Sequence, residues 1–95
     1  MKKNILRELI NDNKPTIGTH VLTVWPGMTE VIGHAGTIDY VEFTATYTPH
    51  DLFALENFGR TIDLFENMSS MIKLDQAPRT YLAKKAVNSG IQNAL

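Results

Sequence analysis

The sequence has 95 residues, a net charge of −1 at pH 7, 43% hydrophobic residues and no cysteine. This length allows one domain, and the balanced charge argues against nucleic acid or an anionic membrane as partner, because both attract a basic excess. The absence of cysteine excludes a disulfide framework and a thiolate site. Polar residues interrupt the N-terminal apolar residues, which is not typical of a signal peptide. No segment approaches the ~20 apolar residues of a membrane span, so we expect a soluble, cytoplasmic protein.

The first part of the chain alternates between helical and extended patterns. Apolar residues recur at helical spacing over residues 3–11, which predicts a short amphipathic helix. Residues 16–25 are rich in β-branched side chains and predict a first strand, which Pro26-Gly27 ends. Residues 28–35 then predict a short helix that stops at Gly36, a C-terminal cap.

The central stretch predicts a strand that leads directly into a capped helix. Residues 38–47 alternate with a period of two, so the second strand is expected to end at Tyr47. Thr48 is the expected N-cap, with Pro49 at the first helical position and Asp51 in the capping-box position. The apolar stripe of this helix comprises Leu52, Leu55, Phe58, Ile62 and Phe65. Chemistry is expected just beyond the carboxyl end of such a strand.

The last part of the chain repeats the same unit. Residues 68–74 predict a third, shorter strand, and Ala77-Pro78 opens a helix that Gly90 ends. The side chains expected to face inward from this helix are Tyr81, Leu82, Ala86 and Val87. Residues 91–95 resemble the start of a fourth strand, where the sequence stops.

The order of elements predicts an α/β fold with parallel strands and right-handed helical crossovers. A final strand without a following helix leaves one sheet face uncovered, whereas parallel sheets are covered on both faces. A closed barrel of eight units needs about 250 residues. The chain is therefore either a small open sheet or, as we favour, part of a larger ring. The expected fold is a partial (β/α)8 TIM barrel with an N-terminal helix, about four strands and about three further helices. Residues 1–95 would form one domain truncated after the start of strand 4.

Several short blocks, in order, resemble the opening of the HpcH/HpaI aldolase/citrate lyase family. They are KPTIGTH at 14–20, EVIGHAG at 30–36, DYVE at 39–42, TPHD at 48–51 and MIKLDQAPRTYLAKKAVNSGIQNAL at 71–95. The resemblance implies the N-terminal part of a barrel that cleaves or forms a carbon–carbon bond beside a pyruvate-like carbonyl. It also implies a divalent metal (Mg, Mn or Co) in the full-length protein, a small 2-oxo acid as substrate and a homo-oligomer.

The chain departs from this family at the site itself. Well-studied members end the second strand with an Asp-x-Glu-His block that supplies the catalytic base, and here Thr44 and Tyr47 stand in place of the Asp and the His. The family's substrate-holding arginine corresponds to Lys73, and its aromatic residue on the first strand corresponds to His20. The family's acidic metal ligands lie downstream of Leu95, so no metal is expected to bind to this chain alone.

Lys73 is the strongest candidate for a catalytic residue. It ends an apolar strand, where an ammonium is costly unless it is paired or faces solvent. It could hold a carboxylate or enolate oxygen, with less direction than an arginine would give, or it could form a structural ion pair with Glu42. A Schiff-base role is chemically possible.

The remaining candidates have weaker signals. His20 could hydrogen-bond a substrate oxygen or move a proton, or it could be a hydrogen-bonded core residue. Tyr47 is a poor base at neutral pH but could donate a hydrogen bond, line the pocket or pack on the next helix. Thr44 would form a polar wall that contacts substrate, and Glu42 is expected to pair with Lys73 or His20. His50 is expected to face solvent.

Two functions remain open from the sequence. The first is a fragment of a metal-dependent carbon–carbon lyase in which Lys73 and Tyr47 are catalytic, while His20, Lys73 and Thr44 bind substrate. The alternative is a non-catalytic α/β unit that acts only by association with a partner or with itself, through exposed sheet edges and an uncovered face.

Overall fold

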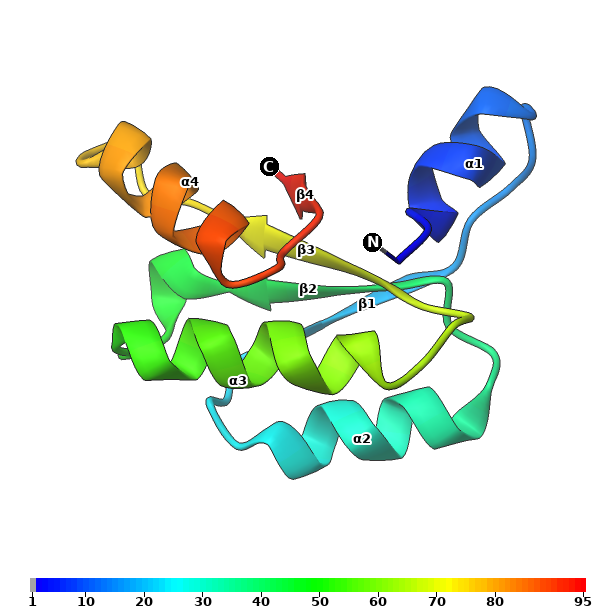
Figure 1. Cartoon of the computed structure of the whole chain (residues 1–95), viewed down its shortest axis with the longest axis horizontal. Coiled ribbons are helices and arrows are strands. Elements are labelled where there is room, and N and C mark those ends of the chain that lie inside the picture. Colours follow the sequence, from blue (N-terminus) through cyan, green and yellow to red (C-terminus); the bar gives the residue numbers. More distant parts are fainter. Residues whose placement is uncertain (1) are drawn as a thin grey trace.

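A computed structural model describes residues 2–95 and shows one sheet of four parallel strands (Figure 1). The strands follow one another in the order β1-β2-β3-β4, so each chain segment adds its strand beside the previous one. Their bounds are β1 (Gly18–Val21), β2 (Tyr40–Thr44), β3 (Ser69–Lys73) and β4 (Asn93–Ala94). The predicted α/β class with parallel strands is confirmed.

Three helices cover one face of the sheet, and a fourth lies at the end where the strands begin (Figure 1). The covering helices are α2 (Pro26–Ala35), α3 (Leu52–Asp63) and α4 (Arg79–Asn88), whereas α1 (Ile5–Asn11) lies at the N-terminal end of the strands. A 3₁₀ turn, η1 (Ala45–Tyr47), follows β2. No helix within residues 2–95 is long and apolar enough to cross a bilayer.

Alternation along the strands separates a packed face from an open face. In β2, Val41 and Phe43 are buried at 0% and 1% exposure, whereas Tyr40 and Glu42, which point the other way, are half-buried. The packed side chains meet the inner sides of the helices in a single core, as the period of two requires. The core residues are Val21, Val41, Phe43, Ala45, Leu55, Phe58, Ile62, Met68, Ile72, Ala86 and Ile91.

The helix ends follow local side-chain chemistry. Helix α2 ends at Gly36, whose φ of 76° lies in the left-handed region that favours glycine, as predicted. Helix α3 begins later than predicted, because Asp51 and not Thr48 is its N-cap: the Asp51 carboxylate accepts the N–H of Ala54 at 2.9 Å. Thr48 is buried instead, and its hydroxyl donates to the carbonyl of Thr44 at 2.9 Å.

Three further predictions about element bounds and orientation are wrong. The first strand is confined to Gly18–Val21, because the chain after Val21 turns toward α2 and leaves the ladder. The second strand ends at Thr44, and Tyr47 lies in the η1 turn. Tyr81 and Val87 of α4 are 50% and 70% exposed and do not face the core, where Ala86 is the buried residue of that helix.

Hydrogen bonds to residues of β3 and β4 hold α1 against the sheet. The Ser69 hydroxyl accepts the N–H groups of Ile5 (2.6 Å) and Leu6 (3.3 Å), which are among the unpaired donors of the first turn of α1. The side-chain amides of Asn4 and Asn93 exchange hydrogen bonds of 2.9 and 3.2 Å. These contacts place α1 beside the starts of β3 and β4.

Candidate active site

The open face of the sheet carries the polar side chains that the sequence singled out. Strand register places His20 of β1 beside Glu42 of β2, and Thr44 of β2 beside Lys73 of β3. Thr44 and Lys73 end their strands, so they lie at the carboxyl edge, where parallel α/β sheets place their chemistry.

Lys73 and Tyr47 come together at this edge. The Lys73 ammonium lies over the Tyr47 ring, 4.8 Å from the ring centroid, which is the geometry of a cation–π contact. Tyr47 is 68% exposed and Lys73 is half-buried, so the ammonium is held by the ring and remains open to solvent. A small anion could therefore approach the Lys73 ammonium from the side away from the ring.

Glu42 does not form the ion pair that was expected. Its carboxylate accepts a hydrogen bond of 2.5 Å from the Thr44 hydroxyl. Among residues 2–95, one ion pair lies within 4 Å, and it joins Arg60 to Glu56 on the surface of α3. Thr44 therefore orients the Glu42 carboxylate, and the Lys73 ammonium stays available for a ligand.

His20 lies apart from the Lys73–Tyr47 pair. It is exposed on β1, and β2 separates β1 from β3, so two strand spacings of about 4.8 Å each lie between His20 and the Lys73 strand. The structure thus brings Lys73, Tyr47 and Thr44 together at the strand ends and leaves His20 beside Glu42.

The hollow at the carboxyl edge includes two residues that the sequence analysis missed. It has a volume of about 440 Å³ and is lined by Ala45, Thr46, Tyr47, Thr48, Pro49, His50 and Asp75. His50 is half-buried and does not simply face solvent as predicted: its Nδ1 lies 2.7 Å from the Thr48 carbonyl oxygen, and its ring meets Phe43 edge-on at 5.4 Å. Asp75 comes two residues after β3, and this spacing was the signal that could have identified it.

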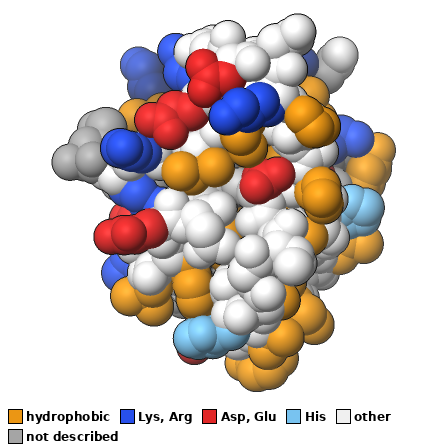
Figure 2. All heavy atoms as spheres, turned by 90° about the vertical axis from the view of Figure 1, so that its right-hand side faces the viewer, with side chains coloured by type: hydrophobic (Ala, Val, Ile, Leu, Met, Phe, Trp, Pro, Cys, Tyr) orange, Lys and Arg blue, Asp and Glu red, His pale blue; other side chains and the backbone are white. Residues whose placement is uncertain are grey.

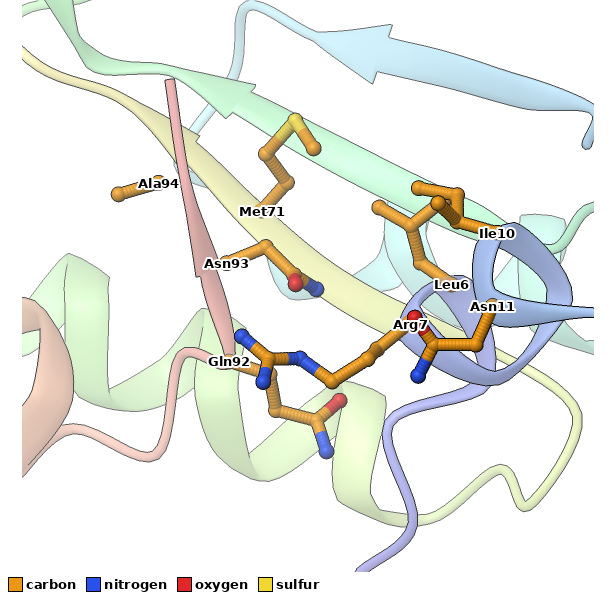
Figure 3. A pocket seen from close by; sticks show the side chains of 8 residues that line it. All are labelled: Leu6, Arg7, Ile10, Asn11, Met71, Gln92, Asn93 and Ala94. Carbon is orange, nitrogen blue, oxygen red and sulfur yellow. The ribbon is translucent and has the colours of Figure 1, made fainter.

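A second hollow lies at the opposite end of the sheet, between α1 and the open face (Figure 3). It also has a volume of about 440 Å³, and its lining residues are Leu6, Arg7, Ile10, Asn11, Met71, Gln92, Asn93 and Ala94. Arg7 is the charged residue of this set, and no lining residue offers a base. This second hollow lies where the strands begin and lacks a base. The carboxyl edge is therefore the better candidate for an active site.

The charged side chains fit neither a metal centre nor a polyanion surface. In residues 2–95 no three His, Asp or Glu side chains gather as a metal-binding group, so the chain does not by itself fit the metal that the family resemblance implies. Acidic and basic side chains lie close together at the end of the molecule that carries α1 (Figure 2). This mixture agrees with the net charge of −1.

Comparisons with known proteins identify the fold. No family profile and no curated protein sequence matches this chain. Among solved structures, citrate synthase SbnG has a TM-score of 0.86 at 17% identity, over 97% of this chain and 36% of the SbnG chain. The HpcH/HpaI aldolase from Desulfitobacterium hafniense DCB-2 has a TM-score of 0.80 at 15% identity, over 97% of this chain and 35% of that chain.

These similarities confirm the expected fold. The four parallel strands and their helices are arranged as in part of an HpcH/HpaI aldolase, as the sequence resemblance implied, and the chain spans about a third of the length of the solved structures that it matches.

Proposed function

We propose that this chain is the N-terminal portion of a carbon–carbon lyase of the aldolase type, which acts on pyruvate-type 2-oxo acids with a divalent metal. The observation that carries the proposal is the Lys73 ammonium, held over Tyr47 at the carboxyl edge of the sheet. The similarity in fold to an HpcH/HpaI aldolase supports it. A homo-oligomer of the full-length protein belongs to the same proposal.

Lys73 would hold the substrate's carboxylate or its enolate oxygen. When the carbon–carbon bond of a hydroxy-oxo acid breaks, its electrons move onto the oxygen of the former carbonyl, and a fixed ammonium stabilises that developing charge. The Tyr47 ring keeps the ammonium at the edge of the sheet, and the Thr44 side chain, which is 5% exposed beside Lys73, would form the adjacent polar wall. The divalent metal (Mg, Mn or Co) would polarise the 2-oxo carbonyl, with ligands from outside residues 2–95.

Proton transfer must be arranged differently from the well-studied branch of the family, because Tyr47 stands where the base is expected. The Tyr47 phenol carries an O–H that can donate a hydrogen bond. Tyr47 would therefore hydrogen-bond a substrate oxygen, and His20 would hold a second oxygen only in a substrate that spans from β3 to β1.

A retro-aldol assay of the polypeptide that carries this chain tests the proposal. We expect pyruvate release from a 4-hydroxy-2-oxo acid in the presence of Mg²⁺, Mn²⁺ or Co²⁺. Lys73→Met should lower kcat by about 100-fold or more, as loss of an oxyanion contact does in other enzymes, and Lys73→Arg should retain part of the activity. Lys84→Met, on the exposed side of α4, is the matched control. The absence of pyruvate from every hydroxy-oxo acid offered would refute the lyase assignment.

The open sheet face favours a second candidate function. A parallel sheet that is covered on one side only has unsatisfied apolar and backbone surface, which suits a non-catalytic α/β unit that works by association. A polypeptide that binds a partner or itself but lacks lyase activity under all metals tested would support this second function over the first.

A further inference from the structure

His50 is a histidine at the carboxyl edge of the sheet whose ring the fold holds in place. Its Nδ1 lies 2.7 Å from the Thr48 carbonyl oxygen, and its ring meets the buried Phe43 ring edge-on, with the ring centroids 5.4 Å apart. Thr48 is itself fixed, because it is buried and its hydroxyl donates to the Thr44 carbonyl at 2.9 Å. This hydrogen bond and this aromatic contact therefore orient the His50 imidazole.

The hydrogen bond to Thr48 determines which ring nitrogen of His50 is free. A carbonyl oxygen only accepts, so Nδ1 carries the hydrogen and donates it. In the neutral ring the lone pair then lies on Nε2, which can accept a proton. The ion pair within 4 Å among residues 2–95 joins Arg60 to Glu56, so no carboxylate of the described chain is paired with Nε2.

His50 belongs to the same edge of the sheet as the Lys73–Tyr47 pair. It lines the hollow of about 440 Å³ together with Tyr47 and Asp75, and the Tyr47 ring also carries the Lys73 ammonium, 4.8 Å from the ring centroid. The Thr46 hydroxyl donates to the Lys73 carbonyl at 3.4 Å, which joins the η1 turn to the end of β3. A substrate whose acid end lies at Lys73 can therefore extend into the hollow that His50 lines.

The proposed lyase reaction needs a base at this place. Cleavage of a 4-hydroxy-2-oxo acid requires removal of the proton from the 4-hydroxyl group. Tyr47 stands where the base is expected, and its phenol is a hydrogen-bond donor. His20 lies on β1, two strands away from Lys73, and His34 lies on the exposed side of α2. His50 is thus the histidine that lines the hollow and has a nitrogen left to accept a proton.

We propose that His50 is the catalytic base of the lyase reaction and takes the proton of the substrate's 4-hydroxyl group on Nε2. This inference rests on the proposed function. As the proton moves to Nε2, the hydroxyl-bearing carbon becomes the carbonyl of the leaving aldehyde, and the carbon–carbon bond breaks. Its electrons pass to the 2-oxo oxygen as an enolate, which the Lys73 ammonium would hold. The methylene carbon of the enolate then takes the proton back from Nε2, which gives pyruvate.

The Thr48 carbonyl acts on His50 as a positioning group. It accepts the Nδ1 hydrogen throughout the reaction, so it keeps Nε2 as the nitrogen that exchanges the proton, and it stabilises the imidazolium that forms between the two steps.

Substitution of His50 by asparagine distinguishes a base from a structural histidine. The asparagine amide can donate to the Thr48 carbonyl, as Nδ1 does, but it offers no nitrogen that accepts a proton. In the metal-dependent retro-aldol assay of the polypeptide that carries this chain, His50→Asn should lower kcat by about 100-fold or more, with a smaller change in KM. His34→Asn, the same change at an exposed histidine of α2, is the matched control and should keep the original kcat.

Chemical rescue provides the second measurement. Free imidazole should restore part of the activity of His50→Ala in proportion to its concentration, and it should not restore Lys73→Met, which lacks an ammonium and not a base. Circular dichroism confirms the folding of each variant, and the rescue of His50→Ala decides the question if His50→Asn does not fold.

Two different failures can be told apart. Pyruvate release by the original polypeptide together with a folded His50→Asn variant of the same kcat overturns the role of His50 and leaves the lyase assignment intact. An inactive His50→Ala variant that imidazole does not rescue also overturns the role of His50, because it assigns this residue to structure. The absence of pyruvate release by the original polypeptide refutes the proposed function, and this inference with it.

Discussion

Lys2 shows how a single charged residue is held where the N-terminal segment meets the connection between α3 and β3. Its Nζ donates to the backbone carbonyls of Ile62, at 3.0 Å, and Met68. Burial lowers the pKa of the Lys2 ammonium, and the nearby Asp63 carboxylate partly opposes that shift. The protonated form is therefore less favourable in the folded chain than in the unfolded chain.

This pKa shift predicts a pH dependence of stability. Between the lowered native pKa and the unfolded value of about 10.4, the native state binds fewer protons, so the contribution of Lys2 to stability rises with pH. We expect the free energy of unfolding of the original chain to increase more, between about pH 7 and about pH 10, than that of Lys2→Met. Urea unfolding at both values measures the difference. Lys3→Met, at an exposed neighbour, should behave like the original chain. Equal slopes for the original and Lys2→Met would contradict the prediction.

Residue type and position predicted Lys73 as a candidate, but only the fold shows what holds it. The sequence suggested a carboxylate partner, and the structure gives the Tyr47 ring instead. The reason is that β2 stops at Thr44 and the η1 turn carries Tyr47 back toward the end of β3. A turn of three residues after a strand leaves no periodic signal, so this contact could not be predicted.

At the scale of elements, Asp51 determines where α3 begins. Its carboxylate caps the Ala54 N–H, whereas the sequence pattern favoured Thr48. Both residues belong to the capping repertoire, and the Thr48 hydroxyl is used by the Thr44 carbonyl. The sequence pattern alone could not decide which of the two residues caps α3, because the carbonyl that engages the Thr48 hydroxyl lies at the end of the preceding strand.

Removal of the Asp51 carboxylate should therefore destabilise α3. Asp51→Ala is expected to lower the free energy of unfolding by about 1 kcal/mol. Asp51→Asn and Asp51→Ser should keep most of the stability that the cap provides, because Asn and Ser are also good N-cap residues. Chemical denaturation of the three variants measures this order. Were Asp51→Ala as stable as the original chain while Asp51→Asn was not, the cap would have no role in stability.

The short strands were harder to predict than the helices. Residues 16–25 are rich in β-branched side chains, yet only Gly18–Val21 join the ladder. Strand length is set by the neighbouring strand, and β2 has just five residues with which to pair. The propensity of β1 therefore overestimated its extent, whereas helix α2 ended at Gly36 as predicted, because its stop signal is local.

For the whole molecule, the order of patterns predicted the parallel sheet and its uncovered face. Each strand was followed by a helical segment, and this alternation leaves few topologies. The same reasoning could not say what covers the open face, because that depends on residues or copies beyond the chain itself. The solved structures match this chain over about a third of their own length, so the similarity describes the four strands and not what covers their open face.

The contact between Asn4 and Asn93 brings the two ends of the chain close enough for a circular permutation. Since these residues touch, a short glycine-rich linker could join the two ends of the 95-residue polypeptide, and new ends could be opened between the exposed Gly36 and Thr37. We expect this circular permutant to have the far-ultraviolet dichroism and urea midpoint of the parent. A permutant that lacks a cooperative transition would show that the backbone order, and not the docking of its ends, maintains the fold.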